Sequence, residues 1–244
     1  DIIVVCSINS FTIGGITTGL LGTGLTLQNN SGDDLSISSN GIFTFSNPLA
    51  DTSNYNVSVS SNPTSPAQIC SASNNTGSVN GSNVENVSII CSTNSYTISG
   101  SISGLSGSGL VLRNNGGDDL AITNGATNFL FATSVADTQT YNVTVAMQPS
   151  SLTQNCVVNS GNGTVSGSNI TGISIVCTTQ SFSIGGTVTG FAGTTMTLQN
   201  NGGNDLSIST DGAFSFSNPL ISETFLILFS IAFIVASSLY TGIN

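Results

Sequence analysis

The sequence predicts an all-β fold made of tandem antiparallel β-sandwich modules with about seven strands each. The first observation is a stretch that occurs three times, beginning at Phe11, Tyr96 and Phe182, so the period is 96 − 11 = 85 and then 182 − 96 = 86 residues. The second is that apolar and polar residues alternate within each copy, as in strands with one buried face. The third is the frequency of Asn, Gly and Asp between these runs, which is typical of turns. A fixed period with strand-like content indicates repeated domains of one fold.

Five segments follow from the positions of the copies. Repeat 1 is residues 9–92, repeat 2 is residues 93–178, and repeat 3 is a truncated copy over residues 179–220. Residues 1–8, DIIVVCSI, match the VSIICST and ISIVCTT at the ends of repeats 1 and 2, which predicts the last strand of a preceding module. Residues 221–244 depart from the pattern and form an apolar tail. We expect the chain to be part of a longer secreted polypeptide.

The strands of repeat 1 are predicted from the alternation of apolar and polar residues. They contain Phe11 and Ile13, Leu25 and Leu27, Leu35 and Ile37, Phe43 and Phe45, Tyr55, Val57 and Val59, and Val87, Ile89 and Cys91. Gly14 and Gly15 predict a bend or bulge, and Pro48 is expected to end a strand because it lacks a ladder N–H. Repeat 2 has the same pattern at Tyr96, Leu110, Leu112, Leu120, Ile122, Phe129, Phe131, Tyr141, Val143, Val145, Cys156, Ile173, Ile175 and Cys177. Connections of about three residues between repeats predict a semi-rigid array.

The apolar tail has three interpretations. Residues 225–240 carry no charge, but sixteen helical residues span only about 24 Å, less than the ~30 Å hydrocarbon core of a bilayer. The tail is a membrane anchor, a strand that patches the incomplete repeat 3, or an end that does not fold natively. A membrane is expected as a partner only if residues 225–240 form an anchor.

The five cysteines share the period of the repeats. Cys70 and Cys91 are 91 − 70 = 21 positions apart, Cys156 and Cys177 are 177 − 156 = 21 apart, and Cys6 aligns with the second cysteine of each pair. Zinc is the alternative, but two thiols per repeat and no His leave a tetrahedral shell incomplete. We predict two disulfides, with Cys6 unpaired in this chain, and an oxidising compartment. Closing a loop of this length stabilises a small module by about 3 kcal/mol.

The composition argues against catalysis and against nucleic acid as a partner. Charged residues make up 5% of the chain, Arg113 is its single basic residue, it has no His, and its net charge is −10. No Ser-His-Asp or Ser-Lys arrangement can be assembled from these residues. The negative charge disfavours polyanionic partners. We therefore predict a protein that is not an enzyme.

Two pairs of carboxylates are weak candidates for a metal site. They are Asp33 with Asp34, and Asp118 with Asp119. Hard cations such as Ca²⁺ bind carboxylate and backbone oxygens, but adjacent residues of a strand point to opposite faces and do not converge. Turn chemistry accounts for the same residues without an ion, and repeat 3 replaces the pair by Asn204 and Asp205. We predict no cofactor, with calcium as the alternative.

The aromatic residues are predicted to form cores rather than a glycan-binding platform. Trp is absent from the chain. The positions that alternation assigns to the core are Phe43, Phe45, Tyr55, Phe129, Phe131 and Tyr141.

The order of short motifs resembles known surface domains. An I-x-G-x-[VI] motif is followed by a turn, then by NGIFTF at residues 40–45 or DGAFSF at residues 211–216, then by YNVSV at residues 55–59. This order resembles carboxypeptidase regulatory-like and collagen-adhesin B-type domains, of the transthyretin-like group with immunoglobulin-like topology. The resemblance covers about the first half of each repeat and implies seven-stranded sandwiches used in tandem on bacterial surface proteins. The adhesin family's internal Lys–Asn isopeptide bond is impossible here, because the chain has no Lys.

These observations predict a spacer or stalk of repeats in an adhesin-like bacterial protein, located outside the cell or on its surface. Its expected partners are neighbouring repeats of the same chain. Two alternatives stay open. One is a module that binds a glycan or protein ligand of a host or neighbouring cell on its loops. The other is a filament subunit that donates residues 1–8 as a strand to another copy.

Overall fold

The structure, a computed structural model, describes residues 2–5, 7–200 and 202–221. All regular secondary structure in these residues is β-strand, which confirms the predicted fold class of tandem antiparallel sandwich modules. The chain divides into two compact units, Asp1–Ser99 with Leu130–Asn142 and Asn162–Gly172, and Gly100–Phe129 with Val143–Gly161 and Ile173–Asn244. Residues of repeat 2 belong to both units. The boundaries assigned to the repeats from the sequence remain predictions.

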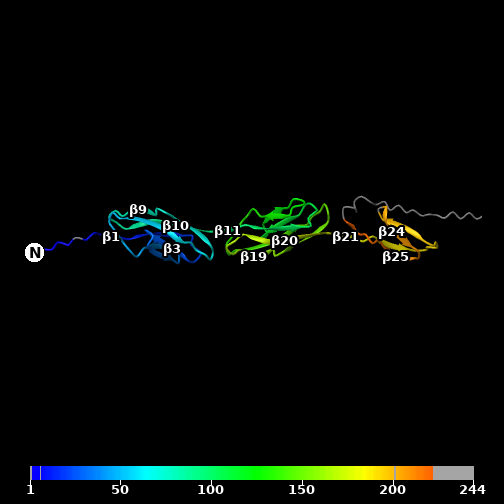
Figure 1. Cartoon of the computed structure of the whole chain (residues 1–244), viewed down its shortest axis with the longest axis horizontal. Helices are drawn as coiled ribbons and strands as arrows, with labels where there is room; N and C mark the ends of the chain where they lie inside the picture. Colours follow the sequence, from blue (N-terminus) through cyan, green and yellow to red (C-terminus); the bar gives the residue numbers. More distant parts are fainter. Residues whose placement is uncertain (1, 6, 201, 222–244) are drawn as a thin grey trace, which may run out of the picture. The chain divides into compact units, whose positions relative to one another are not determined.

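Repeat 1 forms two four-stranded sheets and one short strand pair (Figure 1). The first sheet has the strand order β5-β2-β10-β8, the second has the order β4-β3-β7-β9, and β1 pairs with β6. The strands are β1 (Ser10–Phe11), β2 (Ile13–Thr18), β3 (Leu25–Asn29), β4 (Asp33–Ile37), β5 (Gly41–Thr44), β6 (Leu49–Ala50), β7 (Asn54–Ser61), β8 (Gln68–Ser73), β9 (Thr76–Ser78) and β10 (Val84–Thr93).

One strand pair of repeat 1, β2 with β10, is parallel, whereas its other pairs are antiparallel. The chain crosses between the two sheets before β10 returns beside β2, and a crossover connection is what a parallel pair requires. The predicted bend or bulge at Gly14 and Gly15 is not a bulge of β2, because the register of β2 with β5 runs through both glycines without a break. The irregularity of the β2–β10 pair lies on β10 instead, between Val84 and Val87, opposite Gly14.

The core of repeat 1 lies between its two sheets and follows the predicted alternation. Val87, Ile89 and Cys91 are buried on β10, and the residues between them are half-buried or exposed. Phe43 and Phe45 meet edge to face, with ring centroids 6.0 Å apart. The predicted core role of the aromatic residues is confirmed for Phe43, Phe45, Tyr55, Phe129 and Phe131, which are buried, while Tyr141 is half-buried.

Repeat 2 has the same strand orders, β15-β12-β20-β18 and β14-β13-β17-β19, together with the pair β11-β16. Its strands are β11 (Ser95–Tyr96), β12 (Ile98–Ser103), β13 (Val111–Asn114), β14 (Asp118–Ala121), β15 (Asn128–Leu130), β16 (Val135–Ala136), β17 (Thr140–Met147), β18 (Gln154–Asn159), β19 (Asn162–Thr164) and β20 (Ile170–Thr179). The repeat in the sequence therefore corresponds to a repeat of the strand order.

In its described residues, repeat 3 forms three two-stranded sheets, β21-β26, β22-β25 and β23-β24. Its strands are β21 (Ser181–Phe182), β22 (Gly185–Val188), β23 (Met196–Asn200), β24 (Gly203–Ile208), β25 (Gly212–Ser215) and β26 (Leu220–Ile221). Met196 and Leu198 are half-buried, although their counterparts Leu25 and Leu27 are fully buried. The described part of repeat 3 thus covers its apolar face only in part.

Several predictions concern the ends of the chain. Ile2, Ile3, Val4 and Val5 are exposed and have no regular secondary structure, so a strand of a preceding module stays a prediction. The predictions for Cys6 and for residues 225–240 lie outside the described residues. Within those residues, no helix has both the length and the apolar character that a membrane span needs.

Candidate functional site

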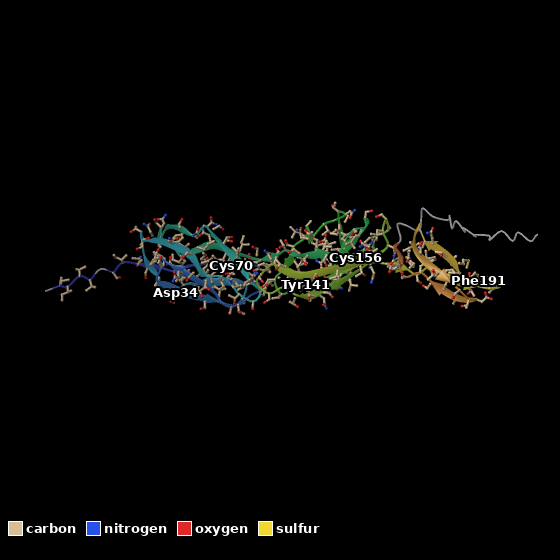
Figure 2. All side chains as sticks on the ribbon, turned by 45° about the vertical axis from the view of Figure 1, so that its right-hand side comes forward. Asp34, Cys70, Tyr141, Cys156 and Phe191 are labelled. Atoms are coloured by element: carbon tan, nitrogen blue, oxygen red, sulfur yellow. A yellow bond between two sulfur atoms is a disulfide. The ribbon has the colours of Figure 1, made fainter. Side chains whose placement is uncertain are left out.

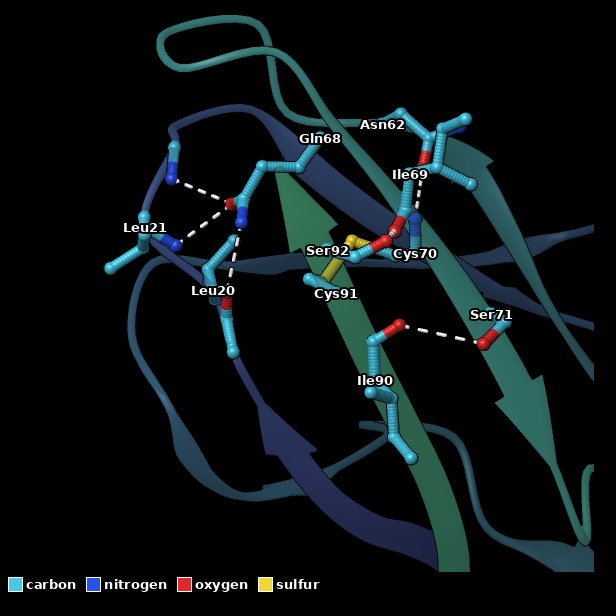
Figure 3. The surroundings of a disulfide bond; sticks show 12 residues. Leu20, Leu21, Asn62, Gln68, Ile69, Cys70, Ser71, Ile90, Cys91 and Ser92 are labelled. Carbon is cyan, nitrogen blue, oxygen red and sulfur yellow. Dashed lines mark hydrogen bonds between the residues drawn. A yellow bond between two sulfur atoms is a disulfide. The ribbon is translucent and has the colours of Figure 1, made fainter. Parts of the chain in front are cut away.

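Two disulfides occupy the same place in repeats 1 and 2. Cys70 of β8 lies directly opposite Cys91 of β10, and the two are bonded. Cys156 of β18 lies opposite Cys177 of β20 and is bonded to it. All four side chains are buried. Each disulfide therefore joins neighbouring strands of one sheet on its core face, and Figure 3 shows the disulfide of repeat 1.

A buried glutamine accompanies the disulfide of repeat 1. Gln68 is on the same face of β8 as Cys70 and is 2% exposed. Its Oε1 accepts hydrogen bonds from the N–H groups of Leu21 and Gly22, both at 2.8 Å, and its Nε2 donates to the Gly19 carbonyl at 2.8 Å. The loop after β2 has no ladder partner for these backbone groups, and the Gln68 amide supplies one (Figure 3). Gln68 thereby fixes this loop to the disulfide-bonded strand.

Gln154 does the same in repeat 2. It is 2% exposed, two residues before Cys156. Its Oε1 accepts from the N–H groups of Ser106 at 2.9 Å and Gly107 at 2.7 Å, and its Nε2 donates to the Gly104 carbonyl at 2.8 Å. The sequence analysis did not single out either glutamine. The available signal was the recurrence of Gln two residues before the first cysteine of each pair.

Replacing Gln68 by leucine is expected to lower the free energy of unfolding of repeat 1 by about 2 kcal/mol, because the buried Gly22 N–H and the part-buried Leu21 N–H lose their acceptor. Urea denaturation and amide hydrogen exchange at Leu21 and Gly22 measure the loss. Gln28→Leu is the matched control, since Gln28 is a half-buried glutamine of β3, and its expected effect is within about 0.5 kcal/mol. Equal effects of the two substitutions would contradict the role of Gln68.

The carboxylate pairs lie at the starts of β4 and β14, after three-residue turns. In repeat 1, Asn30 and Ser31 of this turn have positive φ, 50° and 60°. Asp33 accepts from the Ser46 hydroxyl at 3.3 Å and the Asn47 N–H at 3.2 Å, whereas Asp34 is exposed at the surface (Figure 2). Asp33 thus holds the following strand connection, and the pair does not converge on one point.

In repeat 2 the pair Asp118 and Asp119 also separates. Asp119 receives two hydrogen bonds from the Arg113 guanidinium across the β13–β14 pair, the one from Nη2 at 2.8 Å. This contact lowers the pKa of Asp119 and raises that of Arg113. Asp118 Oδ2 is buried without a hydrogen-bond partner among the described residues. No group of three or more His, Cys, Asp or Glu side chains in the described residues is arranged to hold a metal ion.

The described part of repeat 1 has a shallow open depression near β7 and the start of β10. Polar residues dominate its lining, which consists of Tyr55, Ser78, Asn80, Ser82, Asn83, Val84, Glu85 and Asn86. Tyr55 is 8% exposed, and a Cβ placed on Gly77 would lie 2.8 Å from its hydroxyl oxygen. Because the Tyr55 ring is covered in this way, it does not offer a face on which a sugar could stack.

Comparisons with known proteins support the fold. No family model and no curated protein matches this chain. Among solved structures, the chain is similar to the Bacillus anthracis TIE protein, with a TM-score of 0.52 and 14% identity over 87% of this chain and 44% of that one. The chain thus spans less than half the length of that protein. A major pilin protein (T-13) of Streptococcus pyogenes aligns over 71% of this chain and 97% of its own, at 11% identity and a TM-score of 0.20, which carries no argument.

Proposed function

We propose that this chain is the repeat region of a secreted or cell-surface bacterial protein, in which it acts as a spacer that carries an adhesive or catalytic tip away from the surface. The observation that carries this proposal is the exact recurrence, in repeats 1 and 2, of one disulfide and one buried glutamine network at equivalent positions. The same internal stabilisation in both repeats is what an array of equivalent structural modules requires.

The two disulfides support a location outside the cytoplasm, because disulfides persist in oxidising compartments. The net charge of −10 and the Ser-, Thr- and Asn-rich composition favour a soluble surface that does not bind nucleic acid. Neighbouring repeats are the partners that the spacer requires.

A reach assay tests the spacer. The full chain is displayed on a bacterial surface beneath a fixed binding tip, beside a version from which residues 93–178 are deleted in phase with the period. We expect the deletion to reduce capture of a bulky bead that carries the tip's ligand, and to leave capture of the small free ligand unchanged. Equal bead capture by both versions would contradict the proposal.

A glycan and protein array probed with the tip-free full chain tests the alternative of a binding module. We expect no reproducible micromolar binding, because the aromatic side chains of repeats 1 and 2 lie in cores or are half-buried. Reproducible binding that is lost on substitution of surface loop residues would favour the binding module instead.

A further inference from the structure

Asp137 is the only buried carboxylate among the residues described, with 4% of its surface exposed. Its Oδ1 accepts from the Gly167 N–H at 2.7 Å, within repeat 2, and its Oδ2 accepts from the Ala67 N–H at 2.6 Å. Ala67 belongs to repeat 1, 70 positions earlier in the chain. Burying a carboxylate is costly unless hydrogen bonds compensate it, and charge-assisted bonds from backbone N–H groups are among the strongest.

Two more hydrogen bonds complete a ring around the connection between the repeats. The Asn94 N–H donates to the Ala67 carbonyl at 2.9 Å, and the Asp137 N–H donates to the Asn94 carbonyl at 2.9 Å. Ala67, Asn94 and Asp137 thus each bond to the other two. All three belong to the first compact unit of the chain.

The Ala67 side of the ring is held by the interior of repeat 1. Ala67 lies in a turn in which the Gln68 N–H donates to the Pro63 carbonyl at 3.1 Å, and it bridges to Thr64. The next residue is the buried Gln68, which precedes the disulfide-bonded Cys70. A displacement of the turn would therefore disturb the buried Gln68 and the disulfide-bonded strand β8.

Asp51 is the counterpart of Asp137 in repeat 1, and it has no contact that corresponds to the one with Ala67 among the described residues. Its N–H donates to the Asn9 carbonyl at 2.9 Å, and its Oδ1 accepts from the Gly81 N–H at 2.8 Å, as Asp137 does with Asn94 and Gly167. Asp51 is half-buried, whereas Asp137 is buried. Repeats 1 and 2 thus each have an aspartate in the same arrangement, Asp51 and Asp137. In repeat 2 the turn at Ala67 covers this aspartate.

We propose that Asp137, together with Asn94, is a docking surface of repeat 2 whose partner is the Pro63–Ala67 turn of the preceding repeat. Three hydrogen bonds close the joint, and two of them involve the connecting residue Asn94. The same surface at Asp51 fits a turn of the same kind. This proposal is independent of the proposed spacer function, because it concerns the contact between two repeats and not what the array carries. It can therefore be tested on the isolated chain.

The joint is expected to respond to acid. The Ala67 N–H lowers the pKa of Asp137 most, followed by the Gly167 N–H, while burial raises it and the Thr138 N–H lowers it further. The groups that act on the carboxyl are thus backbone amides, and no charged side chain of the described residues is among them. Because the pKa of Asp137 is lower in the folded chain, the stabilisation from the ionised carboxylate is fully present above the ordinary pKa of Asp. It is lost as the pH falls through the lower pKa of the folded chain.

An NMR titration of the ¹⁵N-labelled full chain tests the joint. We expect the amide signals of Ala67, Thr138 and Gly167 to shift together, with one apparent pKa below the ordinary value for Asp. If the Gly167 signal follows the carboxyl and the Ala67 signal does not, the carboxyl is not bonded to repeat 1 in solution and the proposal is overturned.

A substitution provides the second test. Asp137→Ser removes the carboxylate and keeps a short polar side chain. We expect hydrogen exchange at the Ala67 amide to accelerate roughly tenfold or more, since opening of the joint becomes local, while exchange at Ile89 stays unchanged. Asp51→Ser is the matched control and is expected to leave Ala67 unaffected. Unchanged exchange at Ala67 in a folded Asp137→Ser variant would refute the joint, and the titration decides if that variant does not fold.

Discussion

Replacing Cys70 and Cys91 together by alanine is expected to lower the free energy of unfolding of repeat 1 by roughly 3 kcal/mol or more. The bond closes a loop with a sequence separation of 21 residues, so its removal restores conformational freedom to the unfolded chain. Both side chains also lie in the buried cluster of repeat 1, so their truncation leaves unfilled space. A module of about 85 residues has little stability to lose.

Amide hydrogen exchange measured repeat by repeat checks this loss. Val57 and Ile89 report on repeat 1, and Ile175 reports on repeat 2. The double alanine variant should lose protection at the first two and keep it at the third. Cys156→Ala with Cys177→Ala should give the reverse pattern, and reductant added to the unaltered chain should weaken both repeats. If protection from exchange does not change with reductant, the disulfides do not stabilise the fold of the individual repeats.

The period of the sequence made the fold class predictable. Alternation located Val57, Val87 and Ile89 in the core, because a strand with one buried face has a period of two. The same signal does not say which strands are neighbours. The parallel pair β2 and β10 was therefore missed, since it depends on how the chain crosses between sheets and not on the pattern within either strand.

The hydrogen-bond networks were missed for a different reason. Gln68 and Gln154 are among many polar residues in a chain of Ser, Thr and Asn, and burial of a polar residue is visible only once the loop that it binds is known. Asp137 stood in a turn-like stretch, and its contact with Ala67 lies 70 positions away. Comparing the copies position by position would have found both glutamines, because each lies two residues before the first cysteine of a pair.

The close approach of β10 to β2 predicts a second large effect, at Gly15. A Cβ at this position would lie 1.8 Å from the carbonyl oxygen of Val87, the residue paired with Gly15 in the parallel ladder. A backbone atom of a central strand cannot move aside without separating the strands. Gly15→Ala is therefore expected to destabilise repeat 1 by roughly 3 kcal/mol, the upper end of the usual cost of overpacking. Gly100→Ala should act alike in repeat 2, where the Ile173 carbonyl oxygen would be 2.1 Å from the new Cβ.

Gly186 is the matched control, because it occupies the same position in repeat 3. Among the described residues, a Cβ on Gly186 would meet only the Phe214 ring, at 3.1 Å, and no backbone of another strand. A ring that shifts by a few tenths of an ångström can accommodate this methyl group, so Gly186→Ala should change the denaturation midpoint little, by less than about 1 kcal/mol in free energy. The comparison uses one substitution in three copies of one motif. If Gly186→Ala were as costly as Gly15→Ala, the requirement for glycine would come from β2 and β22 themselves and not from the strand that packs against β2.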